Sequence, residues 1–183
     1  MTFEPSAPSL FDLTGKVAIV TGSSRGIGKA IARRLADHGA RVAVSSRKQD
    51  ACEAVVSEIA AVHGAGRAIA VAANISDKAA LASLAERTTA ELGPIDILVC
   101  NAASNPHYGP LEGIDDAMFR KILDNNVLSN HWLIQLVAPQ MVERQDGAIV
   151  IVSSIGGLRA SSVIGAYNVS KAADMQLARN YAE

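Results

Sequence analysis

Short apolar runs alternate along the chain with longer stretches in which polar and apolar residues are mixed. The short runs are rich in Val and Ile and almost continuously apolar, which is typical of strands covered by helices on both faces. They predict strands at Lys16–Val20, Arg41–Ser46, Ala68–Ala72, Ile95–Cys100 and Ala148–Ser153.

The longer stretches between these runs predict helices, three of which stop at a glycine. The predicted helices are Gly26–His38, Asp50–His63, Asp77–Leu92 and Asp115–Arg144, with a last one from near Gly165 to the end. Because parallel neighbouring strands need a crossover connection, this alternation predicts an α/β fold: a Rossmann-like, doubly wound parallel sheet in three α/β/α layers. Ligands of such sheets bind at the carboxyl ends of the strands.

The length of 183 residues fits one domain, which we expect to span residues 14–183 after an N-terminal extension of residues 1–13. The extension lacks the features of a secretory signal, and the apolar runs are too short to cross a bilayer. We therefore expect a soluble, cytoplasmic protein without a membrane partner. The net charge of −1 and the lack of a basic stripe argue against nucleic acid as a partner. The cysteines and histidines have no metal-ligand spacing, so we expect no metal site.

A glycine-rich segment, TGSSRGIG, follows the first predicted strand and opens the first predicted helix. Glycines there let the main chain approach a pyrophosphate, and the N–H groups of a helix N-terminus attract its negative charge. The alternative interpretation is a tight strand-to-helix turn without a ligand. The segment predicts a dinucleotide site that includes Gly22, Ser24, Arg25, Gly26 and Gly28.

The second predicted strand ends in the sequence SSRK at residues 45–48. An acidic residue at this place would bind the ribose hydroxyls of NAD, but Ser46 and Arg47 stand there. Together with Arg25, Arg47 suits the 2′-phosphate of NADP, because guanidinium groups hold phosphates by charge-assisted hydrogen bonds. We therefore expect NADP(H) as the cofactor. The alternative is that Arg47 and Lys48 simply begin a solvated helix.

Tyr167 and Lys171 are spaced i, i+4, so one face of a helix carries both. Ser154 follows the fifth predicted strand, and Asn126 lies inside the long fourth predicted helix. A carbonyl that accepts a hydride must also gain a proton, which a phenol donates, and a nearby ammonium tunes a phenol toward neutral pH. Ser154 can orient the substrate oxygen, and Asn126 can hold a water that passes protons from Lys171 to bulk. Without the glycine turn, such a Tyr–Lys pair would be an ordinary pair of surface neighbours.

These segments together resemble the short-chain dehydrogenase/reductase family, in the family's order and spacing. The matching segments are Thr21–Gly28, Cys100–Ala103, Asp124–Val127, Val152–Ser154 and Tyr167–Lys171. Within the family, the chain is similar to NADP-dependent carbonyl and retinol reductases of the dehydrogenase/reductase member 4 type. Bacterial 3-oxoacyl-acyl-carrier-protein reductases are a near second.

The resemblance implies an oxidoreductase that transfers a hydride between nicotinamide and a carbonyl or secondary alcohol. It implies that Tyr167 donates the proton, Lys171 binds the nicotinamide ribose, Ser154 binds the substrate oxygen and Asn126 completes the relay. It also implies a homodimer or homotetramer. Further cofactor contacts are implied at Ile27, Asn74, Ile75, Asn101, Ala102, Ala103, Val127 and Tyr167.

Three departures from the family pattern stand out. Asn74-Ile75 replaces the usual Asp-Val, although an amide carbonyl still accepts a hydrogen bond from the adenine amino group. Asn101-Ala102-Ala103-Ser104 replaces Asn-Asn-Ala-Gly, with alanines small enough to let the main chain pass the cofactor. Members of the family are usually longer, so we expect this chain to be a fragment that lacks two strands, a substrate-covering segment and much of the subunit interface.

His107 and Tyr108 follow the fourth predicted strand and are candidate substrate contacts, with ordinary loop residues as the alternative. Retinoids, steroids, sugars, 3-oxoacyl thioesters and xenobiotic ketones all stay open as substrates. Two other functions use the same fold: a non-catalytic nucleotide-binding sensor or scaffold, and an epimerase or dehydratase that keeps its nicotinamide bound.

Overall fold

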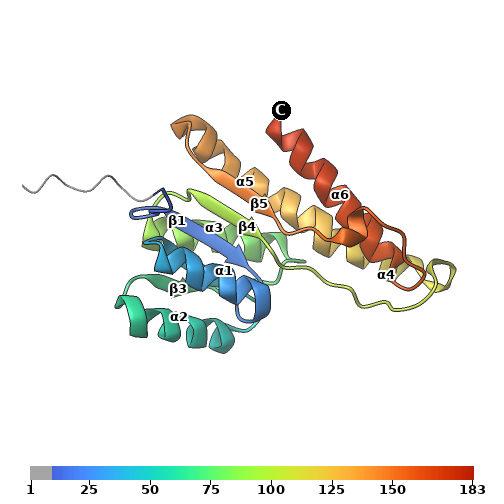
Figure 1. Ribbon diagram of the computed structural model, residues 1–183, viewed down its shortest axis with the longest axis horizontal. Coiled ribbons are helices and arrows are strands. Elements are labelled where there is room, and N and C mark those ends of the chain that lie inside the picture. Colours follow the sequence, from blue (N-terminus) through green and yellow to red (C-terminus); the bar gives the residue numbers. More distant parts are fainter. Residues whose placement is uncertain (1–9) are drawn as a thin grey trace, which may run out of the picture.

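The computed structural model describes residues 10–183, so most of the predicted N-terminal extension lies outside the described residues. Within this range, five parallel strands form one sheet in the order β3-β2-β1-β4-β5 (Figure 1). The strands are β1 Val17–Thr21, β2 Arg41–Ser45, β3 Ala68–Ala70, β4 Ile97–Cys100 and β5 Ala148–Ile151. The strand order reverses beside β1, which places a switch point between β1 and β4.

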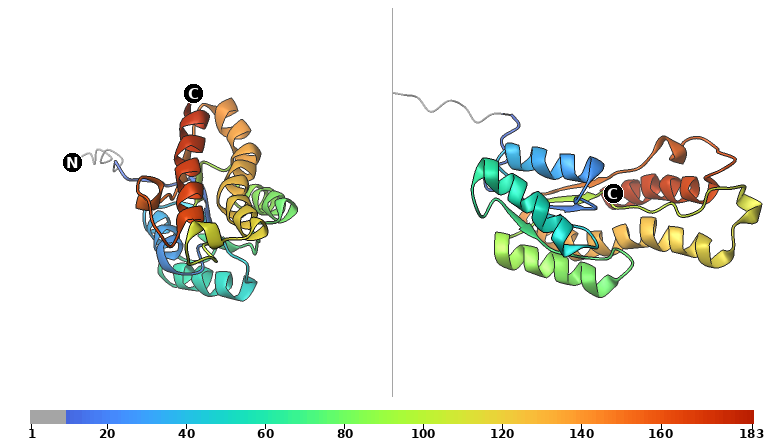
Figure 2. Two further views of the ribbon diagram at one scale, coloured as in Figure 1. Left: turned by 90° about the vertical axis from the view of Figure 1, so that its right-hand side faces the viewer. Right: turned by 90° about the horizontal axis from the view of Figure 1, so that it is seen from below.

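Helices cover both faces of the sheet, as the continuous apolar strands require (Figures 1 and 2). They are α1 Gly26–Asp37, α2 Gln49–His63, α3 Lys78–Leu92, α4 Asp116–Leu123, α5 Ser129–Arg144 and α6 Gly165–Ala182. One core layer joins α1 and α2 to the sheet and includes Ala32 and Val55. The other joins α3 and α5 to the sheet through Leu81, Leu98 and Leu133. The predicted three-layer α/β/α class is confirmed.

The predicted helix Asp115–Arg144 is wrong in one respect, because a wide π-helical turn, Asp124–Leu128, separates α4 from α5. A turn of this width breaks the regular ladder of main-chain hydrogen bonds and leaves carbonyl groups for other donors. Two side chains one turn further along the chain supply these donors. The Ser129 hydroxyl donates to the Asn125 carbonyl at 2.6 Å, and the Asn130 amide donates to the Asn126 carbonyl at 2.7 Å.

The third strand is also shorter than predicted, since β3 ends at Ala70 rather than Ala72. The chain nevertheless continues along β2: the N–H of Val71 donates to the Val44 carbonyl at 3.0 Å, and that of Ala73 donates to the Ser46 carbonyl at 2.9 Å. These bonds carry the chain to the same edge of the sheet at which β2 ends.

Among residues 10–183, no helix has both the length and the apolar character needed to span a bilayer.

Replacing Leu133 by Ala is expected to lower the free energy of unfolding by about 2–5 kcal/mol, because the side chain is fully buried between α5 and the sheet. The matched control is Val142→Ala on the same helix, where the side chain is 74% exposed. The control should change stability by no more than about 0.5 kcal/mol. Urea denaturation measures both, and equal losses in the two variants would contradict the assigned core.

Candidate active site

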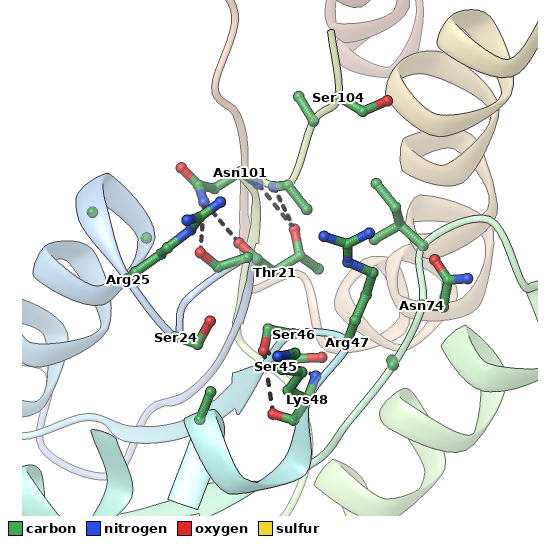
Figure 3. Close-up of a pocket in the computed structure, with 18 of the residues that line it drawn as sticks. Thr21, Ser24, Arg25, Ser45, Ser46, Arg47, Lys48, Asn74, Asn101 and Ser104 are labelled. Carbon is green, nitrogen blue, oxygen red and sulfur yellow. Dashed lines mark hydrogen bonds between the residues drawn. The ribbon is translucent and has the colours of Figure 1, made fainter. Parts of the chain in front are cut away.

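A cleft of about 1040 Å³ opens where β1, β2, β3 and β4 end (Figure 3). This is the edge at which ligands of doubly wound sheets bind. The predicted cofactor residues that line it are Gly22, Ser24, Arg25, Gly26, Ile27, Gly28, Ser46, Arg47, Asn74, Ile75, Asn101, Ala102 and Ala103. Val127, Tyr167 and Lys171 lie outside its lining.

The glycine-rich turn brings α1 against the ends of β1 and β4. Gly22 has a φ of 65°, a left-handed conformation that suits glycine. A Cβ atom on Gly28 would collide with the Gly22 carbonyl oxygen and would lie 2.5 Å from the Asn101 amide nitrogen. Only a residue without a side chain therefore lets the helix start this close to the strand ends.

The N-terminus of α1 points its main-chain N–H groups at the cleft without a side-chain acceptor of its own. The first main-chain bond across its opening turn runs from the Lys29 N–H to the Arg25 carbonyl at 3.2 Å. The first turn carries no acidic residue. Unpaired N–H groups and the positive end of the helix dipole favour an anion at this point.

Two buried hydroxyls that the sequence analysis did not single out hold the strand ends together. Thr21 Oγ1 accepts hydrogen bonds from the N–H groups of Asn101 and Ala102, both at 3.0 Å. The Asn101 amide donates back to the Thr21 carbonyl at 2.9 Å, as Figure 3 shows. Ser23 Oγ donates to the Val20 carbonyl at 2.6 Å and accepts from the Ser45 N–H at 2.9 Å. In the sequence, the signal that could have identified Thr21 and Ser23 is their position just after the apolar run of β1.

The charge of the cleft is one-sided. Arg25, Arg47 and Lys48 line it, and none of the described lining residues is acidic. Figure 3 shows both arginine side chains extending into the cleft, one from the glycine turn and one from the end of β2. Asn74 is exposed, and its side-chain oxygen accepts from the Ser76 N–H at 3.3 Å.

Tyr167 and Lys171 lie on α6, one turn apart, as predicted. The Lys171 ammonium lies 5.8 Å from the centre of the Tyr167 ring. It is almost completely buried, and it donates to the Val152 carbonyl and to Asp174, both at 2.9 Å. Asp174 is a further charged group that the sequence analysis did not consider, although its i, i+3 spacing from Lys171 places it on the same helix face.

Ser154 reaches this region because the loop after β5 packs directly on α6. The Ser153 hydroxyl donates to the Lys171 carbonyl at 2.9 Å. A Cβ atom on Gly157 would lie 2.9 Å from the same carbonyl, so the loop could not lie this close with a larger residue. Ser154 itself caps the short 3₁₀ turn Ile155–Gly157 by accepting from the Gly156 N–H at 3.1 Å. In the described part of the chain it shares no hydrogen bond with Tyr167.

Asn126 is completely buried, and its side chain connects two segments rather than contacting Lys171. Its oxygen accepts from the Ser104 N–H at 2.7 Å, and its amide donates to the Ser104 carbonyl and to Ser170 Oγ, both at 2.9 Å. Ser104 follows β4 and Ser170 precedes Lys171 on α6. Asn126 therefore fixes the loop beside the cleft to the helix that carries Tyr167.

His107 and Tyr108 lie on the loop after β4, outside the cleft lining. Tyr108 is 77% exposed. Gly109 joins this loop to the segment before α6, because its N–H donates to the Val163 carbonyl at 2.9 Å. The loops after β4 and β5 thus meet just before α6, the helix that carries Tyr167.

Burial is the largest cause of the pKa shifts of Asp174 and Cys100, two groups near Lys171. Desolvation raises the pKa of Asp174 above its ordinary value, although the bonds from Lys171 and Asn130 act in the opposite direction. Desolvation also raises the pKa of the Cys100 thiol to about 12, with a further contribution from the nearby charge of Asp174. The Cys100 side chain is therefore a neutral thiol at physiological pH.

Comparison with known proteins places this geometry in a family. A family model described as short chain dehydrogenase matches residues 16–183. The protein named dehydrogenase/reductase SDR family member 4 of Rattus norvegicus is 40% identical over 171 residues, covering 93% of this chain and 60% of that protein. The Homo sapiens protein of the same name is 42% identical over the same length. The chain thus spans about 60% of the length of these curated relatives.

Solved structures show the same likeness. A 7 alpha-hydroxysteroid dehydrogenase complexed with NADH and 7-oxo glycochenodeoxycholic acid superposes with a TM-score of 0.89 at 38% identity, covering 94% of this chain and 66% of that one. A metagenomic short-chain oxidoreductase in complex with NADP superposes with a TM-score of 0.87 at 36% identity, covering 92% and 76%.

Replacing Gly28 by Ala is expected to lower the free energy of unfolding by about 1–3 kcal/mol, because the new methyl group overlaps the Gly22 carbonyl and the Asn101 amide. Gly113→Ala is the control, since a Cβ there would meet only a Pro110 ring carbon at 3.9 Å. Urea denaturation compares the two. Unchanged stability in the Gly28 variant would show that α1 does not approach the strand ends this closely.

Proposed function

Because the chain belongs to the short-chain dehydrogenase/reductase family, we propose that it is an oxidoreductase that transfers a hydride between NADP(H) and a carbonyl or secondary alcohol. Members of the family act on small molecules, and a small carbonyl or alcohol compound is the proposed substrate class. The observation that carries the proposal is an anion-attracting cleft whose lining residue Ser104 is bonded through Asn126 to α6, the helix that carries Tyr167 and Lys171.

The cleft fits a dinucleotide in shape and in charge. Gly22 and Gly28 let α1 begin close to the strand ends, and a pyrophosphate would lie at the N-terminus of this helix, where the free N–H groups favour its negative charge. Beside the end of β2, Arg25 and Arg47 would hold a 2′-phosphate, and no acidic side chain among the described lining residues competes for ribose hydroxyls. Solved relatives bind NADH in one case and NADP in another, so the support for NADP(H) comes from this charge.

The chain's own residues would handle the proton. A nicotinamide cofactor, when bound, would supply or accept the hydride. Tyr167 would donate its hydroxyl proton to the substrate oxygen as that oxygen gains negative charge, acting as the general acid. The Lys171 ammonium next to the ring would favour the phenolate that remains, and Ser154 would hydrogen-bond the same oxygen and orient it.

Other parts of the proposal rest on the sequence and on the family resemblance. We propose that the protein is cytoplasmic and forms a homodimer or homotetramer. We also propose that His107 and Tyr108 contact the substrate, which is supported by the meeting of the loops after β4 and β5. Val127 would line the nicotinamide end of the cofactor site from the turn that also carries Asn126.

NADPH is expected to bind more tightly than NADH in a fluorescence titration of the purified chain. Arg47→Ala should weaken NADPH binding about tenfold or more, because a hydrogen bond to a charged group contributes about 1.5–3 kcal/mol. Binding of NADH should change little. Arg34→Ala, which removes an exposed guanidinium from α1 outside the cleft, is the control. Equal or tighter binding of NADH by the parent chain would refute the NADP assignment.

Tyr167→Phe is expected to lower the turnover of carbonyl substrates by about 10²–10⁴-fold, the range typical of removing a general acid. NADPH affinity should stay near the parent value, because the ring and its neighbours are retained. Tyr181→Phe near the end of α6 is the matched control; this tyrosine bonds His131 and lies outside the cleft. Full turnover in the Tyr167 variant would overturn the proposed chemistry.

A further inference from the structure

Lys171 and Asp174 form an ion pair that is buried on both sides. Their side chains are 2% and 0% exposed, and the ammonium nitrogen lies 2.9 Å from Asp174 Oδ2. Burying two charges costs free energy unless their geometry is good and their remaining hydrogen-bonding capacity is filled. The neighbours of this pair fill much of that capacity.

Asn130 on α5 donates a hydrogen bond to the second carboxylate oxygen of Asp174. Its amide nitrogen donates to Asp174 Oδ1 at 2.9 Å and to the Asn126 carbonyl at 2.7 Å, which uses both of its hydrogens. The hydrogen bonds therefore run without a break from Lys171 through Asp174 and Asn130 to Asn126. The sequence analysis expected a proton relay between Lys171 and Asn126. In the structure, Asp174 and Asn130 connect these two residues by direct hydrogen bonds.

Few other titratable groups face the pair. Lys171 is the cation bonded to Asp174, and the Val152 carbonyl from β5 is the ammonium's second acceptor. The Cys100 thiol at the end of β4 is close enough to feel both charges, and its raised pKa of about 12 keeps it neutral. Within the described residues, Asp174 is thus the counter-charge that the Lys171 ammonium contacts directly.

We propose that Asp174 is a positioning residue, which together with Asn130 fixes the Lys171 ammonium beside the Tyr167 ring and keeps it protonated in its buried site. A buried ammonium without a counter-charge favours the neutral amine. A neutral amine would no longer favour the phenolate of the neighbouring tyrosine. Asp174 therefore acts through Lys171 and need not touch the substrate; the catalytic consequence rests on the proposed function.

The first test measures the state of Lys171 directly. The chain has six lysines, so a sample labelled with ¹³C at the lysine ε-carbon gives few signals, and the one missing from Lys171→Arg identifies Lys171. In Asp174→Asn the Lys171 signal should titrate at a pH lower than in the parent by about one unit or more. Asp116→Asn is the matched control, because Asp116 pairs with Arg120 on the exposed surface of α4. An unchanged Lys171 titration in Asp174→Asn would overturn the proposal.

The second test measures turnover against pH. In Asp174→Asn, kcat should stay near the parent value at acidic pH and should fall at a pH lower than in the parent by about the same interval. A purely structural role of Asp174 would instead lower the folded fraction by a similar factor at every pH and leave the midpoint of the profile in place, which would contradict the proposal. If the parent binds NADPH but turns over no carbonyl compound, the proposed function fails, while the lysine titration still decides the role of Asp174.

A third measurement does not use Asp174→Asn, and so it decides the matter even if that variant does not fold. As the pH of the parent is lowered through the titration of Asp174, followed at its carboxyl carbon, the Lys171 signal should shift at the same pH. The other five lysine signals should not. A Lys171 signal that ignores the protonation of Asp174 would show that the carboxylate does not hold the ammonium.

Discussion

The hydrogen bonds between Asn101 and Thr21 join the ends of β1 and β4 at the edge where the cleft opens. The positions of the other site residues depend on this joint. On one side, the joint leaves only enough room for Gly28, so α1 begins directly over the strand ends and points its N–H groups into the cleft. On the other side, it sets the path of the loop that leads to Ser104. Asn126 bonds both the N–H and the carbonyl of Ser104 in that loop, and it also bonds Ser170 on α6. The loop and α6 are therefore held in a fixed relation.

The half of the site on α6 is held by polar groups inside the protein. A wide turn between α4 and α5 frees carbonyl groups that Ser129 and Asn130 then satisfy, and Asn130 continues to Asp174 and Lys171. Each of these groups would be costly to bury alone, so the hydrogen bonds among them favour the observed arrangement. This explains how a lysine comes to lie buried next to Tyr167, where an isolated ammonium would not be stable.

Much of the fold follows from local patterns. The five apolar runs form the strands, and the glycines at 39, 64 and 93 follow the helices they were expected to end. The departures occur where tertiary contacts compete with local preference. The helix predicted over Asp115–Arg144 widens at Asp124–Leu128, and a helical residue pattern does not reveal such a turn because the same residue types fit both geometries.

For the site, the sequence by itself determined which segments are candidates for the chemistry: the glycine turn, the basic end of β2, and Tyr167 with Lys171 at helical spacing. These predictions depend on short-range spacing and on the rule that parallel strands end at one edge of the sheet. Both can be recognised from the sequence alone. Only the tertiary structure decided what surrounds them. Asp174 and Asn130 are 44 positions apart and bond each other because two helices pack side by side. The burial that gives this contact its strength exists only once the sheet and both helices are assembled, since desolvation is a property of the packed protein and not of any segment.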